Sequence, residues 1–215
     1  MKNIIRILLS SAILIWMTSA KAEIQYGFAL SVGQVDASGT ETEGTAADTS
    51  TRTKSFEEVF VGGDVFIENI FDNGYTVGIS YVPLDLEIGD GSRTDSSTGA
   101  DVASEADTGT RTASADVSDL ITLYTNIPVG SGGYYGLLGV HHATVTTAET
   151  LPNSSYGNED ILGYQAGIGF KEGNYKIELA YSDFEDIDIS STGGDNNNSV
   201  SADADAVQLR LSFAF

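Results

Sequence analysis

The last nine residues of the chain alternate strictly between apolar and polar or small side chains. In residues 207–215 an apolar residue occupies every odd position, whereas Gln208, Arg210, Ser212 and Ala214 occupy the even ones. A period of two predicts a β-strand with one apolar and one polar face. Segments with the same period recur from residue 23 onward, and no run of 18 or more apolar residues follows residue 22. If such a chain crosses a bilayer, it must do so as a closed barrel, because only closure pairs every strand in hydrocarbon.

Eight segments of this kind are expected to form strands. They are residues 23–35, 56–68, 75–88, 116–127, 134–147, 162–170, 175–182 and 207–215. At Pro83 the apolar positions change parity, which predicts a bulge, since proline cannot donate to a ladder. In the strand of residues 134–147 either face could be the outer one, and Leu138 and Val140 are the favoured outward residues.

The connections between these strands alternate in length. Residues 69–74, 128–133 and 171–174 are short connections, whereas residues 38–55, 89–115, 148–160 and 183–205 are long ones. Such alternation is typical of an up-and-down transmembrane barrel with short periplasmic turns and long extracellular loops. The alternative is a soluble lipocalin-like barrel, which would turn its apolar face inward and would not require the alternation.

The chain ends on Phe213-Ala214-Phe215. In this ending it resembles the small outer-membrane barrels of the OmpA barrel, OmpX and Opa group, whose closing strand carries an insertion signal ending in aromatic, any residue, aromatic. Gln208, Leu211, Phe213 and Phe215 are the residues matched to that signal, whereas Arg210 stands where the signal often has glycine. The resemblance implies an all-β, eight-stranded antiparallel barrel that the barrel-assembly machinery inserts into the outer membrane.

The first 22 residues have the pattern of a secretory signal peptide. Lys2 and Arg6 precede a short apolar run, and Ala20-Lys21-Ala22 has the form of a cleavage site. A membrane anchor is the alternative, but the run is shorter than the ~20 residues needed to span a bilayer. We therefore expect a signal peptide at residues 1–22, a barrel domain at residues 23–215, and a location in the cell outer membrane.

The charge is strongly negative, with a formal net value of −21. Nucleic acid is therefore not an expected partner. The four long connections hold 18 of the 31 acidic residues, which places negative charge at the cell surface. One interpretation of these acidic connections is a solvated rim that resists aggregation. The other is contact with outer-membrane lipid and lipopolysaccharide, bridged by divalent cations. No cofactor or metal site is expected, and the chain has no cysteine to form disulfides.

Five charged residues fall on lumen-facing positions of the expected strands. They are Glu58, Asp64, Lys176, Glu178 and Arg210. Buried charges must be paired, because desolvation otherwise costs several kcal/mol. Eight strands leave a bore just wide enough for side chains to fill. An ionic plug is therefore favoured over a conducting path, and the resemblance to OmpA-type barrels implies a network that blocks or gates the lumen.

The expected function is structural or surface display, in adhesion or envelope integrity, by a monomer. A narrow porin for ions or small solutes is the alternative, and an outer-membrane lipid-modifying enzyme ranks third. His141 and His142 are adjacent, so a strand points them to opposite faces, His141 to the lumen and His142 to the rim. They cannot act as a ligand pair, and no catalytic residue is expected.

Overall fold

The computed structural model describes residues 22–45, 48–95, 109–150, 155–192 and 198–215. The expected signal peptide lies outside the described residues except for Ala22, which begins the first strand. Among the described residues no helix is long and apolar enough to cross a membrane.

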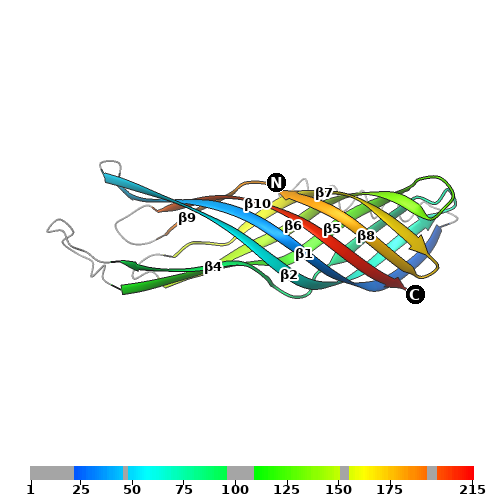
Figure 1. Ribbon diagram of the computed structural model, residues 1–215, viewed down its shortest axis with the longest axis horizontal. Helices are drawn as coiled ribbons and strands as arrows, with labels where there is room; N and C mark the ends of the chain where they lie inside the picture. The colour runs from blue at the N-terminus through cyan, green and yellow to red at the C-terminus, as the bar shows by residue number, and fades with distance from the viewer. Residues whose placement is uncertain (1–21, 46–47, 96–108, 151–154, 193–197) are drawn as a thin grey trace.

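The described residues form ten strands in one sheet (Figure 1). The strands are β1 (Ala22–Thr45), β2 (Asp48–Phe71), β3 (Thr76–Tyr81), β4 (Leu86–Asp95), β5 (Gly109–Pro128), β6 (Tyr134–Glu149), β7 (Glu159–Glu172), β8 (Tyr175–Phe184), β9 (Ile187–Ser190) and β10 (Ser199–Ala214). Every pairing between them is antiparallel.

Pairing of the first and last strands closes the sheet into a barrel. β1 and β10 are in register from Gly27 opposite Ala214 to Thr42 opposite Ser199. β3 and β4 both pair with β5, and β8 and β9 both pair with β10. β3 and β4 therefore share one position in the barrel wall, and β8 and β9 share another. The wall has eight strand positions, which confirms the expected eight-stranded antiparallel architecture.

The outward and inward faces follow the expected parity. In β8 exposed and buried residues alternate from Tyr175 to Asp183. Leu138 of β6 is 51% exposed, whereas its neighbour Leu137 is 5% exposed, so the favoured orientation of this strand is confirmed. Large apolar side chains cover the outside of the barrel, which contradicts the lipocalin-like alternative.

The strands extend well beyond the expected boundaries at the end with the long connections. Residues 38–55 were expected to be a loop, but most of them continue β1 and β2 as a hairpin. Figure 1 shows this hairpin and the β4–β5 hairpin projecting at the end opposite the C-terminus. The extension is stable as sheet because β2 and β10 pair with β1 on its two sides, which satisfies the backbone donors and acceptors.

The expected loop of residues 183–205 also contains strand. Ile187 and Ile189 of β9 are buried inside the barrel, together with Ala143, Val145 and Ile161. Part of this expected loop is therefore a strand that contributes to the core of the barrel. Ile187, Asp188 and Ile189 alternate between apolar and polar as in an ordinary strand. The segment is too short, however, to be recognised from its period alone.

The strand expected at residues 75–88, with a bulge at Pro83, is interrupted in the structure. β3 ends at Tyr81 and β4 begins at Leu86, with a register shift between Glu87 and Gly89. The amide of Val82 donates to the carbonyl of Leu120, 3.0 Å away, where β5 has its own irregularity. The proline thus separates two strands instead of bulging one.

Candidate functional site

Arg210 lies in the lumen between two carboxylates. Its Nε and Nη2 donate to the two oxygens of Asp64, at 2.9 and 2.6 Å, and its Nη1 donates to Glu178 Oε2 at 2.5 Å. Glu178 is directly opposite Arg210 on β8, whereas Asp64 lies on β2, beyond β1. The guanidinium can reach it because Ala29 and Ser31, the buried β1 residues between them, are small.

A second ion pair lies nearer to the short turns. Lys176 of β8 pairs with Glu68 of β2, and both side chains are almost completely buried. The ring of Phe66 lies beside both cations, with Lys176 Nζ 4.9 Å and Arg210 Cζ 5.3 Å from its centroid. Both distances suit a cation–π contact, so the aromatic ring joins the two ion pairs into one unit.

Two tyrosines extend this unit across the bore. The hydroxyl of Tyr124 on β5 donates to Glu68 at 2.8 Å, and that of Tyr135 on β6 donates to Glu178 at 2.7 Å. Each ring lies over a glycine on the adjacent strand. A Cβ on Gly78 or Gly169 would come within 2.3 Å of the ring of Tyr124 or Tyr135, respectively.

We call this unit the ionic plug. It comprises Asp64, Phe66, Glu68, Tyr124, Tyr135, Lys176, Glu178 and Arg210. Its residues come from β2, β5, β6, β8 and β10, so it joins opposite walls of the barrel. Buried charges of this kind are tolerated because each has a partner of opposite charge or a strong hydrogen-bond donor.

Four of the five expected lumen charges belong to the ionic plug. Glu58 does not, because it is exposed and lies six residues from Asp64 along β2, toward the long connections. At about 3.3 Å per residue this is roughly 20 Å along the strand. The second β2 carboxylate of the ionic plug is Glu68 and not Glu58. Glu68 lies four residues after Asp64 and therefore on the same inward face of β2, which is the signal that could have identified it.

The expected insertion-signal residues lie on both faces of β10. Gln208 faces the lumen and Leu211 faces outward. Phe213 and Phe215 belong to an aromatic cluster at the short-turn rim with Tyr26, Phe28 and Tyr175. The ring centroids of Tyr26 and Phe215 are 5.7 Å apart, and those of Phe213 and Tyr175 are 5.0 Å apart. Aromatic side chains at this height are typical of a membrane interface.

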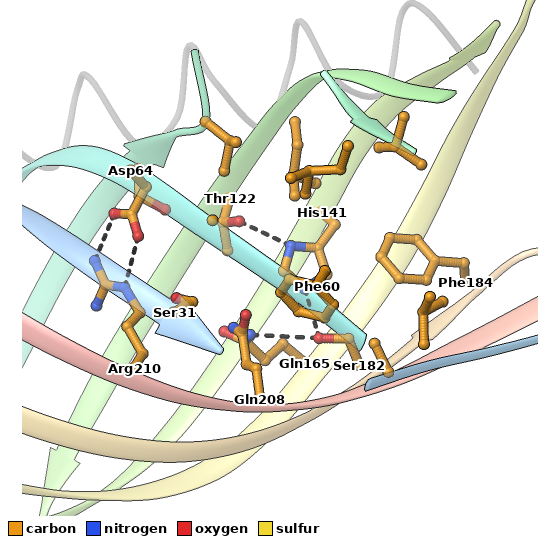
Figure 2. A pocket seen from close by; sticks show the side chains of 18 of the residues that line it. Ser31, Phe60, Asp64, Thr122, His141, Gln165, Ser182, Phe184, Gln208 and Arg210 are labelled. Carbon is orange, nitrogen blue, oxygen red and sulfur yellow. Dashed lines mark hydrogen bonds and ion pairs between the residues drawn. The ribbon is translucent and has the colours of Figure 1, made fainter. Parts of the chain in front are cut away.

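Between the ionic plug and the long hairpins the lumen changes character. Its lining there is mainly apolar and includes Val35, Leu137, Val145, Ile161, Phe184 and Ile187. We call this space the upper chamber. Figure 2 shows Arg210 and Asp64 at one end of it and Phe184 toward the other. Each strand was expected to turn its polar face toward the lumen, so the apolar lining of this half of the barrel departs from that expectation.

A small polar cluster lies where the upper chamber meets the ionic plug (Figure 2). His141 Nδ1 is 2.8 Å from Thr122 Oγ1, and His141 Nε2 is 3.0 Å from Ser182 Oγ. Gln165 donates to the same serine oxygen over 3.4 Å. The inward orientation of His141 agrees with its predicted parity.

This arrangement is a poor nucleophilic site. The second ring nitrogen of His141 faces the hydroxyl of Thr122 and not a carboxylate, so the acidic member of a Ser-His-Asp arrangement is not in place. The described residues also contain no group of three or more His, Asp or Glu side chains placed to hold a metal ion. What the cluster can offer is a set of neutral hydrogen-bonding groups.

Comparison with known proteins decides the fold. No protein-family model matches the sequence, and no curated protein does. The structure is similar to the outer membrane protein OprG from Pseudomonas aeruginosa, with a TM-score of 0.54 and 11% identity over 88% of this chain and 95% of that one. This is the fold of an outer-membrane β-barrel.

A second outer-membrane barrel agrees. The outer membrane protease OmpT from Escherichia coli has a TM-score of 0.54 and 10% identity, over 89% of this chain and 97% of that one. Identities this low establish a shared fold and leave function to be argued from this barrel's own residues.

Proposed function

We propose that this protein is an outer-membrane barrel with a closed lumen and a structural or surface-display role, in adhesion or envelope integrity. The observation that carries the proposal is the ionic plug, which joins β2, β8 and β10 to tyrosines from β5 and β6 across the bore. A lumen filled in this way favours a role played by the outside and the long hairpins over solute passage.

The outer surface supports the location. Outward residues such as Tyr164 and Ile168 are about two-thirds exposed, at 65% and 66%. Soluble proteins rarely expose such contiguous apolar surface, whereas a bilayer covers it. The aromatic cluster around Phe213 and Phe215 lies at one edge of this band.

The extended strands support the display role. They carry polar and acidic side chains, and contacts such as Ser38 to Asp203, at 2.9 Å, hold them together above the barrel. A partner for this surface is lipopolysaccharide, reached through divalent cations that neutralise both anions. The refolded protein should bind a lipopolysaccharide-coated surface in Mg²⁺ and release it in EDTA.

A shortened hairpin provides the matched variant. Gly39 and Lys54 are opposite each other in the β1–β2 ladder, so residues 40–53 can be replaced by Asn-Gly without changing the register. The variant should fold and bind less in Mg²⁺, because Glu41, Glu43 and Asp48 are removed. Undiminished binding would remove this hairpin from the display role.

Conductance separates this proposal from the porin alternative, and the mass of lipid A separates it from the enzyme alternative. The wild-type protein should give no steady current in a planar bilayer, and a steady current would favour the narrow porin. For the lipid-modifying enzyme, expression should leave the mass of lipid A unchanged. A mass shift that depends on Ser182 would favour that reading instead.

A further inference from the structure

We propose that the upper chamber is a binding site for a small neutral amphiphile, with an apolar body about the size of one aromatic ring or a short alkyl chain and a single hydrogen-bonding group. This goes beyond the structural role proposed above, since it assigns a ligand to the inside of the barrel. Three properties of the upper chamber carry the inference: its apolar wall, its size and the chemistry of its floor.

The wall of the upper chamber is apolar, although it faces the lumen and not the bilayer. Interiors of outer-membrane barrels are generally polar, because lumen-facing residues meet water or one another. Here Val145 and Ile161 pack with Ile187 and Ile189, which β9 brings inward from beyond the membrane-facing part of β8. Apolar surface turned toward this partly open space favours an apolar occupant over water.

The size limits the occupant. The cavity, which Asp64, Glu178 and Arg210 of the ionic plug also line at its lower end, has a volume of about 110 Å³. An engineered apolar cavity of about 150 Å³ in another protein stays dry and binds benzene, so this space suits a comparably small apolar body. A larger molecule would have to extend toward the long hairpins.

The floor supplies hydrogen-bonding partners for a polar group of the ligand. His141, Ser182, Thr122 and Gln165 are buried and hydrogen-bond to one another, with Ser182 as the shared member. A serine hydroxyl has one donor and two acceptor sites, and an amide side chain has two of each. A ligand hydroxyl at this level can therefore exchange hydrogen bonds with Ser182 or Gln165 without stranding a charge.

The charge of the floor selects a neutral ligand. Beneath the polar cluster, the ionic plug holds three carboxylates, Asp64, Glu68 and Glu178, against two cations, so its formal charge is negative. Arg210 already pairs with two of these carboxylates, so its positive charge is compensated before any ligand arrives. A ligand carboxylate would meet net repulsion, whereas an alcohol would not.

Photolabelling tests the site directly. The probe is a short aliphatic alcohol whose chain carries an alkyl diazirine, applied to the full protein in lipid nanodiscs, with labelled residues located by mass spectrometry. We expect saturable labelling of inward residues such as Ile161, reduced at least fivefold by excess benzyl alcohol. Outward residues such as Ile168 should be labelled in proportion to probe concentration, because the bilayer also holds the probe. Equal competition by benzoate would overturn the preference for a neutral ligand.

A pair of adjacent substitutions provides the control. Ala206 lines the upper chamber, and Val207 is the next residue of β10 on the outward face. Ala206→Trp should fill the space and abolish saturable labelling of Ile161, whereas Val207→Trp should leave it unchanged. If Ala206→Trp does not fold, Ala204→Leu is the smaller filling variant. Labelling confined to outward residues, or unaffected by the filled chamber, would overturn the proposal.

Discussion

Arg210 and Asp64 form a two-bond ion pair although 146 residues separate them in the sequence. The pair spans β1, the strand that lies between β10 and β2, and it exists only because β1 closes the barrel against β10. Barrel closure and lumen blockage are therefore linked, because the same pairing that removes the sheet edges brings the guanidinium to its partner.

Removal of Arg210 should destabilise the barrel more than removal of an exposed arginine. Arg210→Ala leaves Asp64 and Glu178 in a confined space without their cation, at a cost of about 3–5 kcal/mol. The urea midpoint should fall and the single-channel current should rise. Arg52→Ala, an exposed change on β2, should shift the midpoint little.

A double variant tests the pairing itself. Glu178→Gln in the Arg210→Ala background removes one of the two stranded charges, so its urea midpoint should move back toward that of the wild type. A double variant no closer to the wild type than the single would show that Glu178 and Arg210 do not act as a pair.

Arginine on the outward face should cost more than arginine on the inward face of the same strand. Leu209→Arg should lower the free energy of unfolding by about 2–4 kcal/mol if the position lies near the bilayer midplane, whereas Gln208→Arg should cost less. Titration of refolded protein in liposomes measures both. Equal costs would mean that the lipid-facing side of β10 has been assigned wrongly.

Tyr135 of the ionic plug can occupy its position only because Gly169 has no side chain. Gly169→Ala should displace the ring of Tyr135 and weaken its bond to Glu178, because the added Cβ would lie 2.3 Å from a ring carbon. Gly136→Ala is the matched control, since a Cβ there meets nothing within 4 Å. We expect a lower urea midpoint for the first variant alone. Similar midpoints for both would indicate that the ring adjusts without loss.

Deletion of Phe215 should lower the yield of inserted barrel. The residue stacks on Tyr26, and its amide donates to the carbonyl of Tyr26 at 2.8 Å, so it completes the closing pair of strands at the rim. Heat-modifiable migration on a gel reports the folded fraction from cells. An unchanged yield would remove the basis for treating the C-terminal aromatic as an insertion signal.

Much of the barrel could be predicted because the alternation of side chains along a strand is a local property of the sequence. A period of two assigns an outward and an inward face to each residue, and the assignment holds for Leu138 against Leu137 and for Ile177 against Glu178. Strand ends could not be predicted in the same way. Residues 38–45 and 48–55 are polar and lack an apolar face, and they are strands because neighbouring strands pair with them.

The sequence by itself determined the architecture, the outward and inward faces of most strands and the presence of charges in the lumen, since alternation and turn chemistry act over a few residues. Only the tertiary structure decided which charges meet. Asp64 and Glu68 lie on the same face of β2, yet one pairs with Arg210 and the other with Lys176, because register sets the height of each residue in the bore. The upper chamber depends on the same fact, since β9 delivers Ile187 and Ile189 inward only where β10 is already in place to pair with it.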